Sequence, residues 1–578
     1  MNNPPQVVLA ALRVLNNIAT ATKLAPLGAD DTSSLSEALF SPRPLEALCA
    51  ILWQESTDRT VLEQKRLVAR LICQLGKGTV HQNALVDSGI LDALATMLAA
   101  VATARGEVVP GAQDAGQPDS LADLIPAPGP PDVDLASVLE ALATIVANSR
   151  FRSYLLICSP VIMATFPSIA FPPPPVAASK WAWDALESGP SGSARVRIPG
   201  AMDYLLPDVS AHRSVATKPR GLEEFPPLGF PSPYDDLGAK RRSSAFKFTG
   251  VDATRQDVVS GEDEDVDEPE SPLVPWLIVM VRSTEGLERI AAASLVTSLF
   301  KAGFGSPVRE QHLATLVIPL LCQLLKDNDK EIPASTLQSD FVDPNTAKQW
   351  AIQERAADVL ARLVGESEAL QQAAHGCGII KVALKLLKDS YDPQPVQTPP
   401  KPWSPTPEGA ESDEGLPTCR IGVPGFVPAY AHKIKLRENV LKLVAAMATL
   451  SNDYREALVA GDVVPYIVES LSATPGKPSN ARDRPASEKA AEDGDKAGPS
   501  PYGRNPNAVI LAACHATRAL SRLPSIVRTA MQDYGFAAPL NKLLRHPDAE
   551  VQTAASGVVI NLVTNCSPLV QVSTSAWF

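Results

Sequence analysis

The sequence predicts an all-α superhelix of stacked repeats, a solenoid, that is interrupted by long disordered insertions. The first observation behind this fold class is a period near the end of the chain. The runs ACHATRALSRL from Ala513 and ASGVVINLVTN from Ala555 superpose at an offset of 42 residues, which also brings Leu520 onto Leu562. A period of about 40–47 residues is typical of armadillo and HEAT arrays. Each such unit carries an apolar stripe that only a neighbouring unit can cover.

The second observation is a recurring string of eighteen residues. In each copy a short helix, a glycine and a second helix follow one another. The copies begin at His81, Leu370, Tyr454 and Val527, with alanine fourth (Ala84, Ala373, Ala457, Ala530), leucine eighteenth (Leu98, Leu387, Leu471, Leu544) and glycine ninth or eighth (Gly89, Gly378, Gly535, Gly461). Glycine is expected where one helix stops and the chain takes a positive φ before the next.

A longer amphipathic segment comes before each string and forms the third helix of a repeat. Three helices per period, with a glycine after the first short one, predict armadillo units rather than HEAT units. With further candidates that have no clear string, the long segments are 5–24, 63–75, 135–147, 286–300, 352–364, 436–450, 511–523 and 549–563. They indicate roughly seven or eight units.

Proline-rich and glycine-rich stretches separate these repeats. Proline makes up 53 of 578 residues, near twice the usual share of about 5%. Such segments cannot bury enough apolar area to offset the entropy of ordering them. We therefore expect N-terminal armadillo repeats at 1–156 with a loop at 105–134, a largely disordered insertion at 157–272, central armadillo repeats at 273–390, a disordered loop at 391–431, an armadillo repeat at 432–471, a disordered loop at 472–505, and C-terminal armadillo repeats at 506–572 that form an incomplete end of the array.

Composition excludes several classes of function. The net charge of −12 and the lack of a long basic block argue against nucleic acid as a partner. The start of the chain lacks the pattern of a signal peptide, and the eight cysteines include no C-x-x-C pair. The apolar stretch Leu155–Phe171 is broken by Pro160 and Pro167, so we expect no membrane span. We expect an intracellular protein of the cytoplasm, with the nucleus as a second compartment.

Catalytic motifs are missing from the chain. LGKGTV at Leu75 lacks the spacing of a phosphate-binding loop, and neither G-x-S-x-G nor H-E-x-x-H occurs. The close pairs His375/Cys377 and Cys514/His515 have no second pair nearby, so they do not form a zinc site. We therefore expect no enzyme activity, no cofactor and no metal.

Arginines recur on one side of the long helices. Stepping by 100° around Ala513–Leu523 places Ala516 and Leu520 on one side and Arg518 and Arg522 on the other. Third helices line the concave surface of an armadillo superhelix, so the expected partner-binding groove contains Arg66, Arg70, Arg355, Arg362, Arg518 and Arg522, with Asn17 and Asn561. Its ligand would be an extended peptide with acidic groups or a free C-terminal carboxylate. An ordinary solvated face is the alternative.

Two stretches carry a resemblance to a known family. IQERAADVLARLVGESEALQQAAHGCGIIKVALKLL from Ile352 and HATRALSRLPSIVRTAMQDYGFAAPLNKLLRHPDAEVQTAASGVVINLV from His515 resemble the armadillo scaffold subunit of the GID (CTLH) ubiquitin ligase, the vacuolar import and degradation family. The resemblance implies a non-catalytic scaffold that links a substrate receptor to the ligase core for degradation of target proteins. Its partners would be other ligase subunits, including that receptor and a core scaffold.

The chain departs from this family in two ways. It carries the large insertion at 157–272, and family members continue with more repeats after the last long helix. Receptor docking is associated with those later repeats. On the last helix we expect Val558, Val559 and Val563 to form an exposed apolar patch.

An armadillo carrier such as a nuclear-import receptor is the alternative function. That class needs tryptophan and asparagine in register on successive third helices. The tryptophans stand outside this register, and only Asn17 and Asn561 fit it.

The expected insertions generate a first prediction. Limited proteolysis should cut first within 158–272, 389–431 and 472–504, because segments without buried backbone are the preferred sites of nicking. Early cleavage inside 352–387, read from the masses of the first fragments, would contradict the repeat assignment.

Overall fold

The computed structural model describes residues 4–24, 30–56, 58–106, 125–130, 133–166, 271–305, 307–326, 343–365, 367–393, 428–478, 502, 504–523 and 535–565. All regular structure in these ranges is helical, with no strand. Most residues of the expected insertions lie outside the described ranges. The expected insertion at 157–272 includes one described helix, α9 (Pro160–Thr165), whose Ile162 is buried.

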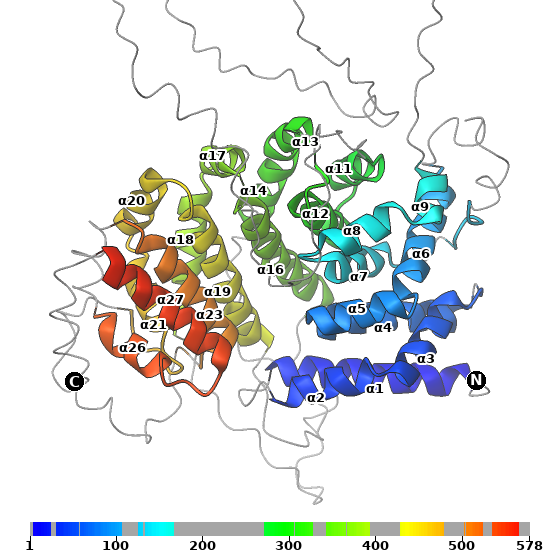
Figure 1. The fold of residues 1–578 in the computed structure, drawn as a ribbon, viewed down its shortest axis with the longest axis horizontal. Coiled ribbons are helices and arrows are strands. Elements are labelled where there is room, and N and C mark those ends of the chain that lie inside the picture. Colours follow the sequence, from blue (N-terminus) through cyan, green and yellow to red (C-terminus); the bar gives the residue numbers. More distant parts are fainter. Residues whose placement is uncertain are drawn as a thin grey trace, which may run out of the picture. The chain divides into compact units, whose positions relative to one another are not determined.

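Long third helices form the backbone of the fold (Figure 1). They are α1 (Pro5–Leu24), α4 (Arg59–Leu75), α7 (Leu135–Val146), α12 (Gly286–Lys301), α16 (Pro344–Val364), α19 (Pro428–Met447), α23 (Asn507–Leu520) and α27 (Ala549–Asn565). Each one packs directly on the next in this order, from α1 on α4 to α23 on α27. This ladder is the stacking that an armadillo-type superhelix requires, and it confirms the predicted fold class.

Shorter helices complete the repeats beside this ladder. They are α2 (Asp30–Leu39), α3 (Pro42–Trp53), α5 (Thr79–Asp87), α6 (Ile90–Ala104), α8 (Arg150–Ile157), α9, α11 (Leu273–Ser283), α13 (Pro307–His312), the π-helix η3 (Leu313–Val317), α14 (Ile318–Lys326), α17 (Glu368–Gly376), α18 (Ile379–Asp389), α20 (Asn452–Ala460), α21 (Val464–Ser470) and α26 (Ala537–Leu543). Among the described helices, none is by itself long and apolar enough to cross a membrane. The bent pair α5 and α6, which meet at 71°, reaches that length and hydropathy only together.

The turn between the two short helices follows the predicted glycine rule, with one informative exception. Gly89, Gly378 and Gly535 have φ values of 78°, 75° and 72°. In the fourth copy the positive φ of 61° belongs to Asp462, one residue after Gly461. A Cβ on Gly461 would lie 2.2 Å from Leu384 Cδ1 of the preceding repeat. A larger residue at 461 would displace the end of the Leu384 side chain, and an aspartate takes the left-handed position beside Gly461.

Polar side chains from two successive repeats meet at the C-terminal end of α7. Gln82 of α5 donates to the carbonyl of Thr144 at 2.8 Å, and Arg152 of α8 donates to those of Ile145 and Ala147 at 2.7 and 2.9 Å. The last carbonyls of a helix have no partner within the helix, so these donors satisfy groups that burial would otherwise penalise.

The same arrangement recurs at the end of α19. Gln371 of α17 donates to the carbonyl of Ala446 at 2.7 Å, and Arg455 of α20 donates to those of Ala448 and Thr449, both at 2.7 Å. Gln82, Gln371 and Arg455 all occupy the second place of the eighteen-residue string. The repeat therefore encodes a polar link between neighbouring units as well as an apolar one.

The last helix, α27, corrects one detail of the expected apolar patch. Val558 is fully buried, together with Val551 and Ala555, and α27 packs on α23. Ile560, which the sequence reasoning did not single out, is the large apolar side chain exposed there, at 63%. The side chain of Val563 lies outside the described residues.

The polar link predicts a specific loss of stability. Arg455→Met keeps the aliphatic packing but leaves the carbonyl of Ala448 without its side-chain donor and removes one of two donors to the carbonyl of Thr449, so we expect unfolding to become easier by about 2 kcal/mol. Urea unfolding measures the loss, and hydrogen exchange should locate it at the end of α19. Lys381→Met, at an exposed position of α18, is the matched control. Equal stability of the two variants would contradict the prediction.

Candidate partner-binding surface

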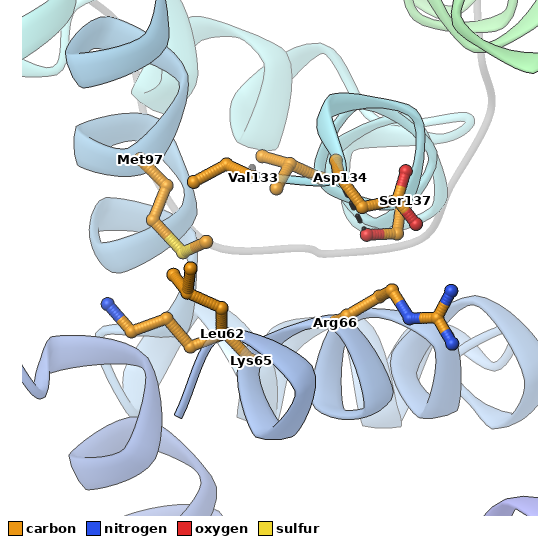
Figure 2. A pocket seen from close by; sticks show the side chains of 8 residues that line it. Leu62, Lys65, Arg66, Met97, Val133, Asp134 and Ser137 are labelled. Atoms are coloured by element: carbon orange, nitrogen blue, oxygen red, sulfur yellow. Dashed lines mark hydrogen bonds between the residues drawn. The ribbon is translucent and has the colours of Figure 1, made fainter. Parts of the chain in front are cut away.

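The predicted arginines of α4 lie at its exposed side. Arg66 and Arg70 are both exposed, and Arg66 Nη2 lies 2.9 Å from Glu63 Oε1 one turn earlier. Arg66 also lines a small pocket with Leu62, Met97 and Ser137 (Figure 2). The internal volume of this pocket, about 10 Å³, has room for one water at most. It therefore does not serve as a ligand site.

The predicted arginines of α16 are paired with acids. Arg355 forms an ion pair with Glu140 of α7. Arg362 lies 3.1 Å from Asp358 and donates to the Ser294 hydroxyl of α12 at 2.9 Å. In the ladder, α12 stands between α7 and α16. The side chains of Arg355 and Glu140 therefore meet across α12, which lies between their own helices.

Next to these arginines, α19 adds lysines and one more acid. Lys442 Nζ lies 3.3 Å from Asp358 Oδ1 and 2.7 Å from Glu438 Oε1, and Lys435 Nζ lies 2.7 Å from Glu438 Oε2. We name these neighbouring ion pairs together the central charged strip. It consists of Glu140, Arg355, Asp358, Arg362, Lys435, Glu438 and Lys442.

The strip holds two carboxylates firmly in their charged form. Burial raises the pKa of Asp358, but Arg362, Lys442 and Lys435 outweigh it and bring that pKa to about 2. Burial likewise raises the pKa of Glu438, and Lys435 and Lys442 bring it to about 2. Both groups are therefore anions at any physiological pH.

Glu140 at the other end of the strip behaves differently. Burial raises its pKa, and Asp134 acts in the same direction. The positive charges of Arg355, Arg362 and Arg70 oppose this but do not cancel it. The α7 end of the strip is therefore less well supplied with compensating charge than the α16–α19 end.

On α23 the two predicted arginines have different roles. Arg518 is exposed and lies along α27, where a Cβ on Gly557 would come within 3.3 Å of its Nη1. Arg522 donates to the carbonyl of Thr449 at 2.9 Å, so it contributes to the polar link at the end of α19. Of the pair, Arg518 is the one that can be changed without removing a described helix-capping contact.

Asparagines join adjacent third helices. Asn561 donates to the carbonyl of Arg518 at 3.2 Å, Asn439 to that of Glu354 at 2.8 Å, and Asn16 to that of Leu67 at 3.1 Å. Asn16 is buried, whereas the predicted Asn17 is exposed. The sequence reasoning missed Asn16 and Asn439, and the helical phase of buried Leu12 and Ala19 was the signal that selects Asn16 over Asn17.

Other chemistry is not assembled in the described ranges. No three His, Cys, Asp or Glu side chains there come together as ligands for a metal ion. The described cysteines form no disulfide. The geometry of this face is that of a charged protein surface supported by buried polar contacts.

The paired carboxylates predict a pH dependence of stability. A carboxyl whose pKa is lowered by folding stabilises the fold above its unfolded value and loses that contribution as the pH falls toward the folded value. The urea midpoint should therefore drop as the pH falls from about 4.5 to about 2, the range set by Glu438. Glu438→Gln should flatten part of this drop. If it has the same pH profile as the exposed control Glu456→Gln, the prediction is wrong.

Known proteins show limited similarity to this chain. No protein-family model matches the sequence. Among solved structures, a designed armadillo repeat protein is 14% identical, covers 50% of this chain and 82% of its own, and has a TM-score of 0.29. An engineered protein that covers 97% of both chains is 16% identical with a TM-score of 0.31.

A curated relative gives the more specific result. The chain is 26% identical over 296 residues to GID complex subunit 5 of Schizosaccharomyces pombe. This match spans 51% of the chain but only 29% of the relative, so the chain spans less than a third of that protein. The match confirms the predicted resemblance of this armadillo array to the scaffold subunit of the GID complex.

Proposed function

We propose that this chain is a non-catalytic scaffold of a multisubunit ubiquitin ligase in the cytoplasm and nucleus. In this role it links a substrate receptor to the catalytic core, so that bound target proteins are ubiquitylated and degraded. The observation that carries the proposal is the match to GID complex subunit 5 over half of the chain.

The structure supports a scaffold in two ways. The described residues form a ladder of stacked helices whose polar side chains are engaged in holding neighbouring units together. Stacked repeats expose extended surfaces, which suit the binding of other subunits.

We further propose that the predicted residues of the third helices contact partner subunits. These are Arg66, Arg70, Arg355, Arg362, Arg518 and Arg522, with Asn17 and Asn561. The exposed members Arg66, Arg70, Arg518 and Asn17 are open to direct contact. Arg355 and Arg362 contribute through the central charged strip, and Arg522 and Asn561 support the helices that present it.

Purification of the tagged full-length chain from cells tests the scaffold role. We expect the purified assembly to contain RING-type subunits and a receptor, and to ubiquitylate a bound substrate, whereas the chain alone should transfer no ubiquitin. Removing the chain should separate the receptor from the core. If receptor and core remain together without it, the proposed linking function is wrong.

The same purification tests the arginine surface. Arg518→Glu should reduce the recovery of at least one partner and leave thermal stability nearly unchanged, because surface changes usually alter it by less than about 0.5 kcal/mol. Arg545→Glu, an equal change of charge at an exposed position after α26, is the control. Full recovery of every partner by Arg518→Glu would exclude this residue from the binding surface.

A further inference from the structure

Positive charge exceeds negative charge around the central charged strip, although the whole chain carries a net charge of −12. Groups that act electrostatically on one another across this face include seven bases and four acids. The bases are Arg70, Lys77, Arg355, Arg362, Lys435, Lys442 and Arg518, and the acids are Asp134, Glu140, Asp358 and Glu438. The face is therefore locally basic on an acidic protein.

The positive charges of the strip act on the pKa values of two neighbouring groups, Lys77 and His515. Desolvation by the surrounding protein lowers the pKa of Lys77, although this residue is exposed, and Lys435 and Lys442 lower it further against the opposing effects of Glu438 and Asp358. Burial also lowers the pKa of His515, and Arg518 and Lys442 act in the same direction. Both residues lie where an additional anion would relieve repulsion between like charges.

Part of the strip is already neutralised by its own acids. Lys442 is bonded to both Asp358 and Glu438, and Lys435 to Glu438. The Lys435 side chain is 43% exposed, and an ammonium group has three donors. Among the described residues its ion-pair partner is Glu438, so Lys435 is well placed to bind a second carboxylate from solution.

We propose that the central charged strip binds an extended, carboxylate-rich segment of a partner subunit, and that Asp358 and Glu438 weaken this binding by competing for Lys435 and Lys442. This proposal rests on the scaffold function, because it names the kind of partner segment that the scaffold holds. Side-chain carboxylates fit better than a nucleic-acid backbone, since the fixed acids of the strip would repel a continuous row of phosphates.

The length of the segment follows from the ladder. Packed helix axes lie about 8–10 Å apart, and an extended chain advances about 3.3 Å per residue, so a bound peptide passes roughly three residues per third helix. A segment of roughly twelve residues would cover the strip and reach the flanking bases on α4 or α23.

The proposal is tested on the full-length chain by removing one positive or one negative charge from the strip and measuring peptide affinity. The probe is a fluorescent glutamate-rich peptide of roughly twelve residues, followed by anisotropy. Lys435→Gln should weaken binding about three- to fivefold, and Glu438→Gln should strengthen it about two- to threefold. Lys381→Gln, at an exposed position of α18, should leave it unchanged. Added salt should weaken binding, because it screens exposed charges.

A structural role of these residues would give a different pattern. If the strip acted only by holding α16 against α19, both Lys435→Gln and Glu438→Gln would weaken binding in proportion to their loss of thermal stability. That result would overturn the proposal, as would absence of peptide binding at low salt or tighter binding of a single-stranded oligonucleotide of similar length. Because the Lys435 side chain is exposed, Lys435→Gln should fold even if Glu438→Gln does not, so peptide binding can be measured with at least one of the two variants.

The outcomes of this test and of the scaffold test are separable. If the ligase assembles but the peptide does not bind, the scaffold function is supported and the proposed acidic segment is wrong. If the peptide binds and the two variants change its affinity in the predicted directions, but no ligase subunits copurify with the chain, the strip is a binding surface and its proposed partner, a ligase subunit, is wrong.

Discussion

The fold depends on how the C-terminal carbonyls of the third helices are satisfied. Apolar stripes bring α7 or α19 against its neighbours, but their last turns then become buried with carbonyls that lack partners within the helix. A glutamine from the same repeat and an arginine from the following repeat supply the missing donors, as Gln371 and Arg455 do for α19. Because each link uses groups from two units, one repeat without its neighbour would lose polar as well as apolar stabilisation.

Close stacking of the third helices also determines where long charged side chains can lie. Small buried residues such as Ala291, Ala292 and Ala293 of α12 let α7 and α16 approach from either side. Long side chains are excluded from those contacts and gather on the inner face, where Glu140 and Arg355 meet across α12. The charged strip is thus a consequence of the ladder.

Much of the architecture could be predicted because it depends on local rules. The 42-residue offset and the glycine string located the repeats, since a period and a positive φ are properties of short segments. Helical phase also placed Arg518 on the exposed side of α23. The pairing of Arg355 with Glu140, some two hundred residues earlier in the chain, could not be predicted, because it depends on how α7 and α16 pack on α12. The positive φ of Asp462 falls at the ninth place of its string, as in the other three copies, although the glycine of that copy stands one place earlier.

The strip shows why a basic surface on an acidic chain need not bind anions indiscriminately. Its fixed acids, Asp358 and Glu438, stay charged because Lys435 and Lys442 stand beside them, and the same acids reduce the attraction that these lysines exert on a ligand. An incoming carboxylate must therefore compete with a neighbour that is already in place and has no entropy of association to lose. A single acid would gain little from such a site, whereas several acids on one extended segment can engage the flanking bases together. Selection for acid-rich segments then follows from the competition itself, without a pocket for any one side chain.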